Sequence, residues 1–505
     1  MSKFASTQRT SVQHPIRTGT SPVQRTYEGG EAFGLDLQSE LFLLACTNLV
    51  SENTFYEKAS DRDNRFEQLI AQAVAKEPDW VARLVPFLRN EMGMRSAAVV
   101  LACEYVKAGG AEGRKVIDAA CQRADEPAEV LGYWLARHGR KIPQPVKRGV
   151  ADAAKRLYTE RNVLRYDGDR RDIRFGDVLE LTHPKPKDPG QNLLFRYLLD
   201  SRHHGDEQPY GILKDDAELQ GLAEDFRRRY ISRNGLPREW SWERLAGWLP
   251  GGMDAEAWEW AIPNMGVFAL IRNLRNFDEK KISEKAIDKV IEKITDAGEV
   301  ERSRIWPLNV WTAYREAPSD NWKRALGKTL ELAAKNVPEL SGRSAVLVDV
   351  SGSMEGRLSA RGTVQRWELA AVFAAALALK NDTTIVTFSY SPTEIHIPEG
   401  TSALQIIAYI KNSVGGGTNL VQAMRLTWDR AKYERMIVFT DEQARDSGHL
   451  EVADIQPCYV FDLAGYGRPA LQSGDRGHYR FGGFSDQLFK AIPVLEGGHF
   501  GEWPF

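Results

Sequence analysis

The sequence places acids and hydroxyls directly after two apolar segments of strand length. The run Ser344-Ala-Val-Leu-Val-Asp349 continues into Val-Ser351-Gly-Ser353, so oxygen-bearing side chains recur at every second residue. A second apolar run, Met436–Phe439, leads to another acid, and a glycine-rich loop before it adds a third hydroxyl. These groups offer only hard oxygen donors, which suit Mg²⁺, with Mn²⁺ as the alternative, and do not suit zinc. The predicted ligands of this divalent cation are Asp349, Ser351, Ser353, Thr418 and Asp441.

Two other interpretations of the Asp349–Ser353 run are open. It could be an ordinary capped turn, because Asp and Ser favour helix starts, but the matching Thr418 and Asp441 favour the metal site. Asp349 could also accept a phosphoryl group. That chemistry usually needs a second acid two residues on, where this chain has Ser351. Neither a Gly-x-Ser-x-Gly elbow nor a P-loop occurs, so we do not expect an enzyme.

A second chemical feature is a block of positive charge. Residues 140–174 contain eleven Lys or Arg and five Asp or Glu, a net charge of +6, within a chain whose formal net charge is -2. Cations neutralise phosphates, and the neighbouring Tyr158 and Tyr166 could stack on unpaired bases, so the block suits RNA. A solvated helical face is the alternative. The predicted phosphate-binding arginines of this block are Arg161, Arg165, Arg170, Arg171 and Arg174.

The residues from about 35 to 325 must position this block, and their pattern is helical. Apolar residues recur at helical spacing, and breaks at Lys76–Pro78, Gly93, Gly109–Gly110 and Glu126–Pro127 limit the helices to about 10 to 18 residues. Antiparallel amphipathic helices with short turns are typical of an irregular α-solenoid. We therefore expect a flexible basic arm at 1–30, a helical-repeat domain at 31–325 and a separate domain at 326–505.

The last domain follows a different pattern. Apolar strands at 344–349, 383–388, 436–439 and 459–461 alternate with helices such as 367–380 and 402–411. Alternating strands and helices predict an α/β domain with a doubly wound parallel sheet, and the ends of its parallel strands would gather the predicted metal ligands.

Composition is consistent with a folded protein of the cell interior. The 505 residues are 42% hydrophobic and 27% charged, which excludes fibrous and largely disordered classes. The four cysteines, Cys46, Cys103, Cys121 and Cys458, are too scattered for a disulfide framework. The longest apolar run is eleven residues, against about 20 for a membrane span, and no signal peptide is evident. We expect a cytoplasmic protein with no membrane partner.

The predicted metal ligands resemble the metal-ion-dependent adhesion site (MIDAS) of von Willebrand factor A domains, over roughly residues 340–505. In that family the two serines and the threonine bind the ion, and the two aspartates act directly or through water. This resemblance implies a free coordination position for an acidic group of a partner protein.

The helical part resembles the TROVE module of Ro proteins. The matching segments are Asp177-Val-Leu-Glu-Leu-Thr-His183-Pro-Lys185-Pro, Ile262-Pro-Asn-Met, Leu270-Ile-Arg272-Asn-Leu-Arg-Asn276 and Arg304-Ile-Trp-Pro307. Their order ahead of a MIDAS-type domain resembles the bacterial Ro-like proteins, over residues 35–505. The resemblance implies an all-α HEAT-like ring closed by the von Willebrand factor A domain.

The same resemblance implies a function. Ro proteins bind small non-coding Y RNAs on the basic outer surface and single-stranded RNA ends in the central hole, and they act with exoribonucleases in RNA quality control and stress response. His183 and Lys185 match RNA-contacting positions of the family, although His183 could instead be a buried core residue. Extra residues near 167–171 leave open which of Arg161, Arg165, Arg170 or Arg174 matches the upstream contact.

We therefore expect a non-enzymatic RNA-binding protein. Arg272 could line the inner face of the ring or pair with an acid. Eight of the thirteen tryptophans lie in residues 240–322, and we assign them to packing. The alternative function is a metal-dependent protein-interaction scaffold, and a metal-dependent hydrolase is a third hypothesis.

Overall fold

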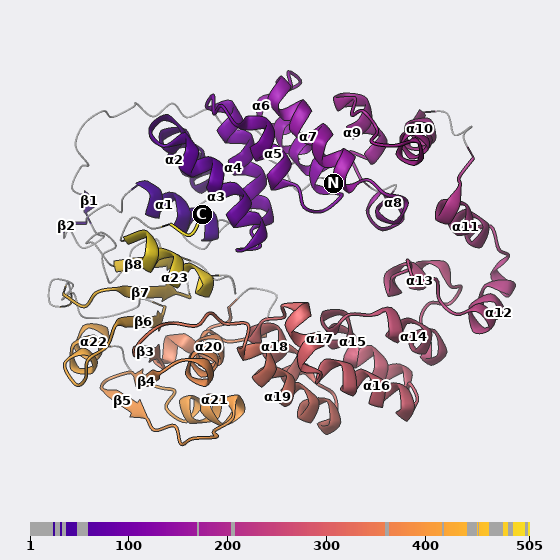
Figure 1. Cartoon of the computed structure of the whole chain (residues 1–505). Helices are drawn as coiled ribbons and strands as arrows, with labels where there is room; N and C mark the ends of the chain where they lie inside the picture. Colours follow the sequence, from indigo (N-terminus) through magenta and orange to yellow (C-terminus); the bar gives the residue numbers. More distant parts are fainter. Residues whose placement is uncertain are drawn as a thin grey trace.

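A helical array and a six-stranded sheet together form a ring in the computed structural model (Figure 1). The structure describes residues 24–25, 31–32, 37–47, 59–168, 171–203, 208–358, 363–416, 419–441, 452, 454–463, 478–482, 488–499 and 503–505. The predicted arm at 1–30 lies outside this set except for β1 (Gln24–Arg25), which pairs with β2 (Glu31–Ala32) in an antiparallel manner. None of the described helices is long and apolar enough to cross a lipid bilayer.

The helical array begins with helices that form the upper arc of Figure 1. These are α1 (Leu37–Thr47), α2 (Ala59–Lys76), α3 (Pro78–Asn90), α4 (Arg95–Lys107), α5 (Gly113–Ala120), α6 (Glu126–His138), α7 (Gln144–Leu157), α8 (Glu160–Tyr166), α9 (Phe175–Thr182) and α10 (Pro189–His203). The predicted break at Lys76–Pro78 is confirmed, because α2 ends at Lys76 and α3 begins at Pro78. Proline fits the first turn of a helix, where its missing N–H is not needed.

The array then turns at the right of Figure 1 and returns as the lower arc. Its helices are α11 (Gly211–Gln220), α12 (Glu224–Asn234), α13 (Trp242–Trp248), α14 (Ala255–Ala261), α15 (Val267–Lys280), α16 (Glu284–Ile294), α17 (Ala297–Ser303), α18 (Pro307–Glu316) and α19 (Asp320–Ala334). Side chains of Ser241, Asp254, Ser283 and Asp296 accept hydrogen bonds from backbone N–H groups at four of these helix starts. Such caps satisfy donors that the helix itself leaves without partners.

The predicted domain boundary at 325/326 falls inside a helix. Helix α19 is continuous from Asp320 to Ala334, and it packs on α18 and on α20 (Arg366–Lys380). Its buried residues Trp322, Leu326 and Leu330 keep one apolar face across the boundary, so the helical array ends at Ala334. The predicted boundary was wrong because the sequence pattern changes visibly only at the apolar strand 344–349. The end of the helix before that strand has no comparable signal.

The sheet has the strand order β5-β4-β3-β6-β7-β8. Its strands are β3 (Ser344–Asp349), β4 (Thr383–Phe388), β5 (Pro392–Ile395), β6 (Arg435–Thr440), β7 (Cys458–Asp462) and β8 (His478–Gly482), and all pair in parallel except β5 with β4. The predicted parallel sheet is confirmed for β3, β4, β6 and β7. The two edge strands were not predicted, because β5 is half-exposed and β8 alternates polar and apolar residues, so neither has a continuous apolar run.

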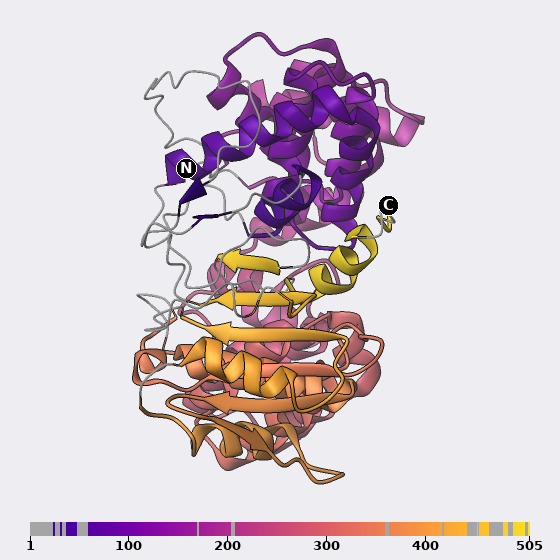
Figure 2. The same ribbon diagram turned by 90° about the vertical axis from the view of Figure 1, so that its left-hand side faces the viewer.

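Helices cover both faces of the sheet, as predicted. One face packs on α20 and on α23 (Leu488–His499), where the Phe489 ring lies 4.2 Å from the Phe373 ring and 5.2 Å from the Phe461 ring. The other face packs on α22 (Leu420–Trp428), with Leu347 and Met424 in one buried cluster. Helix α21 (Ala403–Lys411) packs on α20. Figure 2 shows the strands side by side, with β8 at the edge nearest the N-terminal helices.

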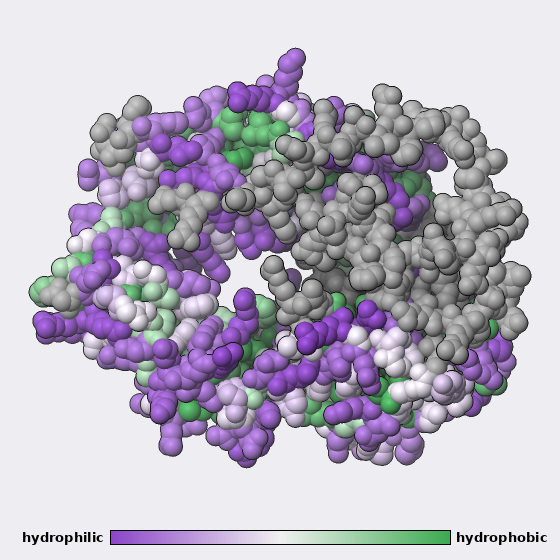
Figure 3. Space-filling model, turned by 180° about the vertical axis from the view of Figure 1, so that it is seen from behind, coloured by the Kyte–Doolittle hydropathy of each residue, from purple (hydrophilic) through white to green (hydrophobic). Residues whose placement is uncertain are grey.

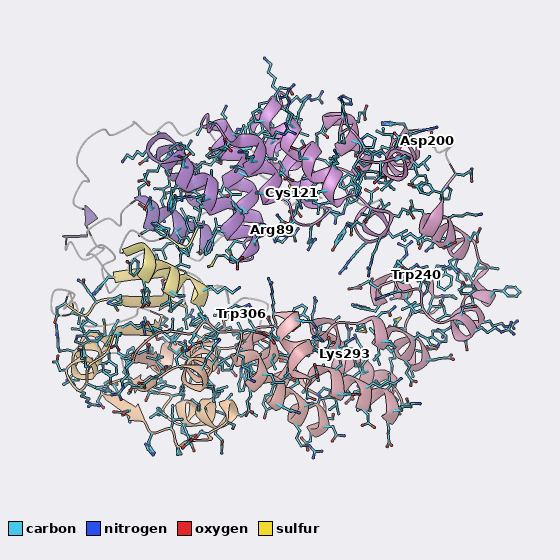
Figure 4. The ribbon with its side chains drawn as sticks, viewed as in Figure 1. Arg89, Cys121, Asp200, Trp240, Lys293 and Trp306 are labelled. Atoms are coloured by element: carbon cyan, nitrogen blue, oxygen red, sulfur yellow. The ribbon has the colours of Figure 1, made fainter. Side chains whose placement is uncertain are left out.

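The C-terminal residues close the ring. Helix α23 and strand β8 contact α1, and the Trp503 ring lies 5.2 Å from that of Trp80. Lys490 of α23 donates to the backbone oxygen of Glu91 at 2.8 Å, and its ammonium lies 5.9 Å from the centre of the Trp306 ring. Figure 4 shows Arg89 and Trp306 at facing edges of the two arcs. An opening remains at the centre when all atoms are drawn, and its described rim is largely hydrophilic (Figure 3).

Candidate metal centre and nucleic-acid interface

The ends of β3 and β6 bring Asp349 and Asp441 to one edge of the sheet. The two strands are parallel neighbours in which Val348 lies opposite Phe439. Asp349 comes directly after Val348, and Asp441 comes two residues after Phe439. Thr440 Oγ1 donates to Asp349 Oδ2 at 2.7 Å. Both carboxylates are buried, with no exposed surface. This arrangement agrees with the prediction from the strand-end pattern.

The hydroxyls of the predicted site lie beside Asp349. The backbone N–H of Ser351 donates to Asp349 Oδ1 at 2.9 Å, and the hydroxyl oxygens of Ser351 and Ser353 are 3.1 Å apart. The glycine-rich loop is fixed to this turn, because the Gly415 N–H donates to the backbone oxygen of Val350 at 2.7 Å. Thr418, the fifth predicted ligand, lies outside the described residues.

The electrostatics of this edge favour a cation. Burial raises the pKa of Asp349 to about 6, and hydrogen bonds from Ser351 and Thr440 oppose that rise while the charge of Asp441 adds to it. Two buried carboxylates that lie this close repel each other, and a positive charge beside them relieves the repulsion.

One residue of the site was missed by the sequence reasoning. Arg366, the first residue of α20, places its Nη1 atom 3.1 Å from Asp441 Oδ2 and 3.3 Å from the backbone oxygen of Ser353. Arg366 stands in another element, 75 residues before Asp441, and the motif around Asp349 gives no signal for it.

The side chains present fit a hard divalent cation in type. Asp349, Ser351, Ser353 and Asp441 supply two carboxylates and two hydroxyls, the donors that Mg²⁺ and Mn²⁺ prefer. Within the described residues, no three His, Cys, Asp or Glu side chains gather closely enough to hold an ion by themselves. The two serine hydroxyls are therefore an essential part of any cation site here.

The structure divides the basic block into paired and unpaired cations. Arg156 Nη2 lies 2.8 Å from Asp118 Oδ1 and donates to the backbone oxygen of Cys121. Arg171 lies 3.4 Å from Asp125, and Arg174 lies 3.4 Å from Asp167. These arginines hold helices and loops together, so Arg171 and Arg174 are less available to RNA than the sequence suggested. Arg170 lies outside the described residues.

The other described Lys and Arg residues between 140 and 187 form no ion pair with a described residue, and most of them are exposed. They are Arg140, Lys141, Lys147, Arg148, Lys155, Arg161, Arg165, Lys185 and Lys187.

Gln191 joins two parts of this set into one surface. Its side-chain Nε2 donates to the backbone oxygen of Lys155 at 2.8 Å, and its Oε1 accepts the N–H of Lys187 at 2.9 Å. The end of α7 therefore lies beside the segment that follows α9. We call the exposed cations Lys155, Lys185 and Lys187 at this junction, together with Arg161 and Arg165 of α8, the basic junction.

His183 lies next to the basic junction in an exposed position. It ends α9 in the left-handed conformation (φ 48°, ψ 56°), and its N–H donates to the backbone oxygen of Leu179 at 2.8 Å. Its side chain is exposed, so the alternative of a buried core histidine was wrong. The turn that ends the helix therefore leaves the imidazole accessible to a ligand.

The two tyrosines have different roles. Tyr158 is buried and its ring stacks on Phe175 at 4.0 Å, so it packs the core and is not available to bases. Tyr166 is partly exposed, with the guanidinium groups of Arg123 and Arg165 at 5.1 and 5.3 Å from its ring centre. Tyr166 is the aromatic residue of the block that could stack on a base.

The structure also bears on Arg272 and on the tryptophans of the lower arc. Arg272 is exposed over the Phe268 ring at 5.6 Å and pairs with no acid in the described part of the chain, so the acid-pair alternative was wrong. The tryptophans between 240 and 322 pack as predicted. Trp240, Trp248, Trp258, Trp306, Trp311 and Trp322 are buried, and Trp242 and Trp260 are partly buried against the same core.

Comparison with known families finds two domains. Residues 222–364 match the TROVE domain, and residues 345–443 match the von Willebrand factor type A domain. The TROVE match contains three of the four segments on which the resemblance was based, and the segment with His183 lies before it. Both predicted domains are therefore present in the predicted order.

Two related proteins carry the name RNA-binding protein RO60. The protein of Caenorhabditis elegans is 29% identical over 197 residues, which are 35% of this chain and 30% of that protein. The protein of Deinococcus radiodurans is 23% identical over 438 residues, 78% of each chain. The crystal structure of the Deinococcus radiodurans RO (RSR) protein superposes with a TM-score of 0.71 and 18% identity, over 92% of this chain and all of the other. The chain is thus homologous to a bacterial Ro protein and has its fold.

Proposed function

We propose that this chain, in which a TROVE domain precedes a von Willebrand factor type A domain, binds RNA without catalysing a reaction on it. The ligands proposed are a small structured non-coding RNA of the Y type and single-stranded RNA ends. Both relatives named above are called RNA-binding proteins, and this supports the RNA class. RNA quality control or stress response in the cytoplasm, in partnership with an exoribonuclease, is the cellular role proposed with it.

The single observation that carries the proposal is the basic junction. Its five cations have no acidic partner among the described side chains, whereas the arginines around them are paired. Leaving so many like charges together has an electrostatic cost. A polyanion removes that cost, because these cations neutralise its phosphates and release the counterions condensed on it. His183 and Tyr166 add a hydrogen-bonding and a stacking group beside these charges.

The position of α8 supports the proposed binding of single-stranded ends. Helix α8, which carries Arg161, Arg165 and Tyr166, lies on the side of the upper arc that faces the opening in Figure 1. A single strand fits a groove that combines cations with an aromatic platform, because every base has a face that can stack. The structured part of the RNA would bind the exposed Lys155 and Lys187.

A divalent cation is the cofactor proposed for the sheet domain, Mg²⁺ in preference to Mn²⁺. Asp349, Ser351, Ser353 and Asp441 would hold it, with Thr418 as a fifth ligand. The ion would supply a positive coordination centre for an acidic group of a partner protein. The hydrogen bonds from Thr440 and from the Ser351 backbone hold both oxygens of Asp349 and so orient the carboxylate that would bind the ion.

A gel-shift experiment tests the RNA proposal. The probe is a stem-loop RNA with a single-stranded 3′ tail, and the variant is Arg161→Glu/Arg165→Glu/Lys185→Glu. The expected result is a loss of affinity of at least a hundredfold, because three attractive phosphate contacts become repulsive. The matched control is Arg275→Glu/Arg302→Glu, which reverses exposed charges of the lower arc and should bind as the wild type does. Equal affinity of the triple variant and the wild type would contradict the proposal.

Asp349→Asn separates this function from the scaffold alternative. RNA binding should persist in this variant, since the basic junction lies in the helical array. If binding instead requires Asp349 and a divalent cation and resists nuclease treatment of the sample, the chain is a metal-dependent protein-interaction scaffold. Sequencing the RNA that copurifies with the native protein would identify the ligand.

A further inference from the structure

Arg366 lies directly beside Asp441, one of the two carboxylates that would bind the divalent cation. Its Nη1 atom makes both contacts to the site, one to Asp441 Oδ2 and one to the backbone oxygen of Ser353. The Arg366 side chain is 19% exposed and the carboxylate of Asp441 is 0% exposed. Solvent screens the attraction in such a pair less than at the surface, and removal of either partner would leave the other charge buried without compensation.

The seat of Arg366 is built by the backbone around it. The Arg366 N–H donates to the backbone oxygen of Gly356 at 3.0 Å, and the Leu358 N–H donates to that of Val364 at 2.9 Å. A Cβ atom at Gly356 would lie 3.1 Å from Arg366 Nη1, 3.2 Å from its Cζ and 3.1 Å from the backbone oxygen of Ser353. The glycine therefore leaves space for the guanidinium. The two backbone hydrogen bonds fix the start of α20 against the segment Gly356–Leu358.

The pairing changes the charge balance of the predicted metal site. Asp349 and Asp441 together carry two negative charges when ionised, and Arg366 neutralises one of them. A divalent cation bound to the same carboxylates would lie within a few ångströms of the guanidinium, and like charges at that distance repel by several kcal/mol at the effective dielectric constant of about 20 that suits protein sites. Binding of the ion to Asp441 therefore weakens the ion pair between Asp441 and the guanidinium, and that ion pair weakens binding of the ion.

We propose that Arg366 is the resident counter-ion of Asp441 and competes with the divalent cation for it. The proposal rests on the metal site proposed above and is independent of RNA binding. Arg366 lowers the affinity of the site for the divalent cation, because the ion binds only when the guanidinium leaves Asp441. Its Nε atom is buried and makes no hydrogen bond to a described residue, so the seat holds the guanidinium through Nη1 alone and its displacement breaks few contacts.

Manganese titration of the full-length chain tests this inference. Free Mn²⁺ is measured by electron paramagnetic resonance for the wild type, Arg366→Gln and Arg366→Lys. We expect Arg366→Gln to bind Mn²⁺ at least tenfold more tightly than the wild type, and Arg366→Lys, which keeps the charge, to stay within about threefold of it. Arg430→Gln is the matched control, because Arg430 is exposed beyond the end of α22 and forms no ion pair among the described residues.

A second measurement guards against a variant that folds poorly. Without metal, Arg366→Gln leaves Asp441 buried without this partner and should lower the melting temperature, and Mn²⁺ should raise it more than in the wild type. Asp349→Asn added to Arg366→Gln should abolish the gain. The inference is overturned if Arg366→Gln binds Mn²⁺ no more tightly than the wild type, or if Arg366→Lys gains as much as Arg366→Gln.

Discussion

Trp503 Nε1 donates a hydrogen bond to Oε1 of Gln38 at 2.9 Å, across 465 positions of sequence. The same indole contacts Phe42 and Trp80, and the neighbouring Phe505 ring lies 4.8 Å from Phe87. The last residues of the chain are thus an aromatic clasp on the first helices. The ring depends on this clasp, on α23 and on Lys490 for its closure on the side of the sheet.

Removal of the clasp should loosen the ring. Trp503→Ala loses one hydrogen bond and the ring contacts with Phe42, Trp80 and Phe505. Because the position is half-buried, we expect a loss of about 2 kcal/mol in the free energy of unfolding. Small-angle scattering should also show a larger radius of gyration. Tyr390→Ala is the control, because Tyr390 is 66% exposed. If thermal unfolding and scattering of Trp503→Ala match the wild type, the clasp does not close the ring.

The buried acid Glu126 should make the helical array sensitive to acid. Burial alone would raise its pKa, but hydrogen bonds from Arg89, from the N–H groups of Gln122 and Arg123, and from Arg95 keep the pKa below its usual value. Because the folded-state pKa is lower than that of the unfolded chain, the carboxylate contributes stability above about pH 4.5 and loses this contribution as pH falls through the folded-state pKa.

Glu126→Gln tests this assignment. We expect the variant to be less stable by about 3 kcal/mol at pH 7, because the arginines lose a charged partner. Urea unfolding curves of the variant and the wild type should converge as the pH falls below 4. Glu331→Gln, at an exposed position of α19, should match the wild type at every pH. A difference between Glu126→Gln and the wild type that stays constant from pH 7 to pH 3 would contradict the pKa direction.

His183 should contribute to RNA affinity and not to stability. His183→Asn keeps a residue that tolerates the left-handed conformation, so the end of α9 should be preserved. We expect about fivefold weaker binding of the stem-loop RNA, which corresponds to the loss of about one hydrogen bond, and an unchanged melting temperature. His203→Asn is the control, because His203 pairs with Glu180. Equal RNA affinity of the two variants would remove His183 from the interface.

Tyr166 and Tyr158 should separate stacking from packing. Tyr166→Ala should weaken binding of a single-stranded oligonucleotide by about 1 to 3 kcal/mol, the usual contribution of one stacked base, with little effect on folding. Tyr158→Ala should instead lower the melting temperature, because it removes a buried ring that stacks on Phe175. Fluorescence anisotropy and thermal unfolding measure the two effects. If Tyr166→Ala lowers the melting temperature and leaves oligonucleotide affinity unchanged, Tyr166 does not belong to the proposed interface.

The comparison of sequence and structure shows which features are local. The acids at the ends of β3 and β6 could be predicted, because an apolar strand followed by Asp is a pattern in consecutive residues. The pairing of Arg366 with Asp441 could not, because it depends on how α20 packs beside a strand far along the chain. For the same reason the sequence did not separate Arg171 from Arg161 and Arg165, because its partner Asp125 lies 46 residues earlier, just before α6. The partner of Arg174 is Asp167 within the same block, and the net charge of the block does not show which of its acids pairs with which arginine.

The salt dependence of RNA binding tests the central claim most directly. Dissociation constants for the stem-loop RNA, measured between about 50 and 300 mM salt, give a slope of log affinity against log salt that counts the phosphates neutralised. For Arg161→Gln/Arg165→Gln/Lys185→Gln we predict a slope shallower by about 2 to 3 units than that of the wild type, while Arg171→Gln/Arg174→Gln should change stability more than slope. An unchanged slope in the triple variant, or wild-type binding that does not respond to salt, would contradict the account.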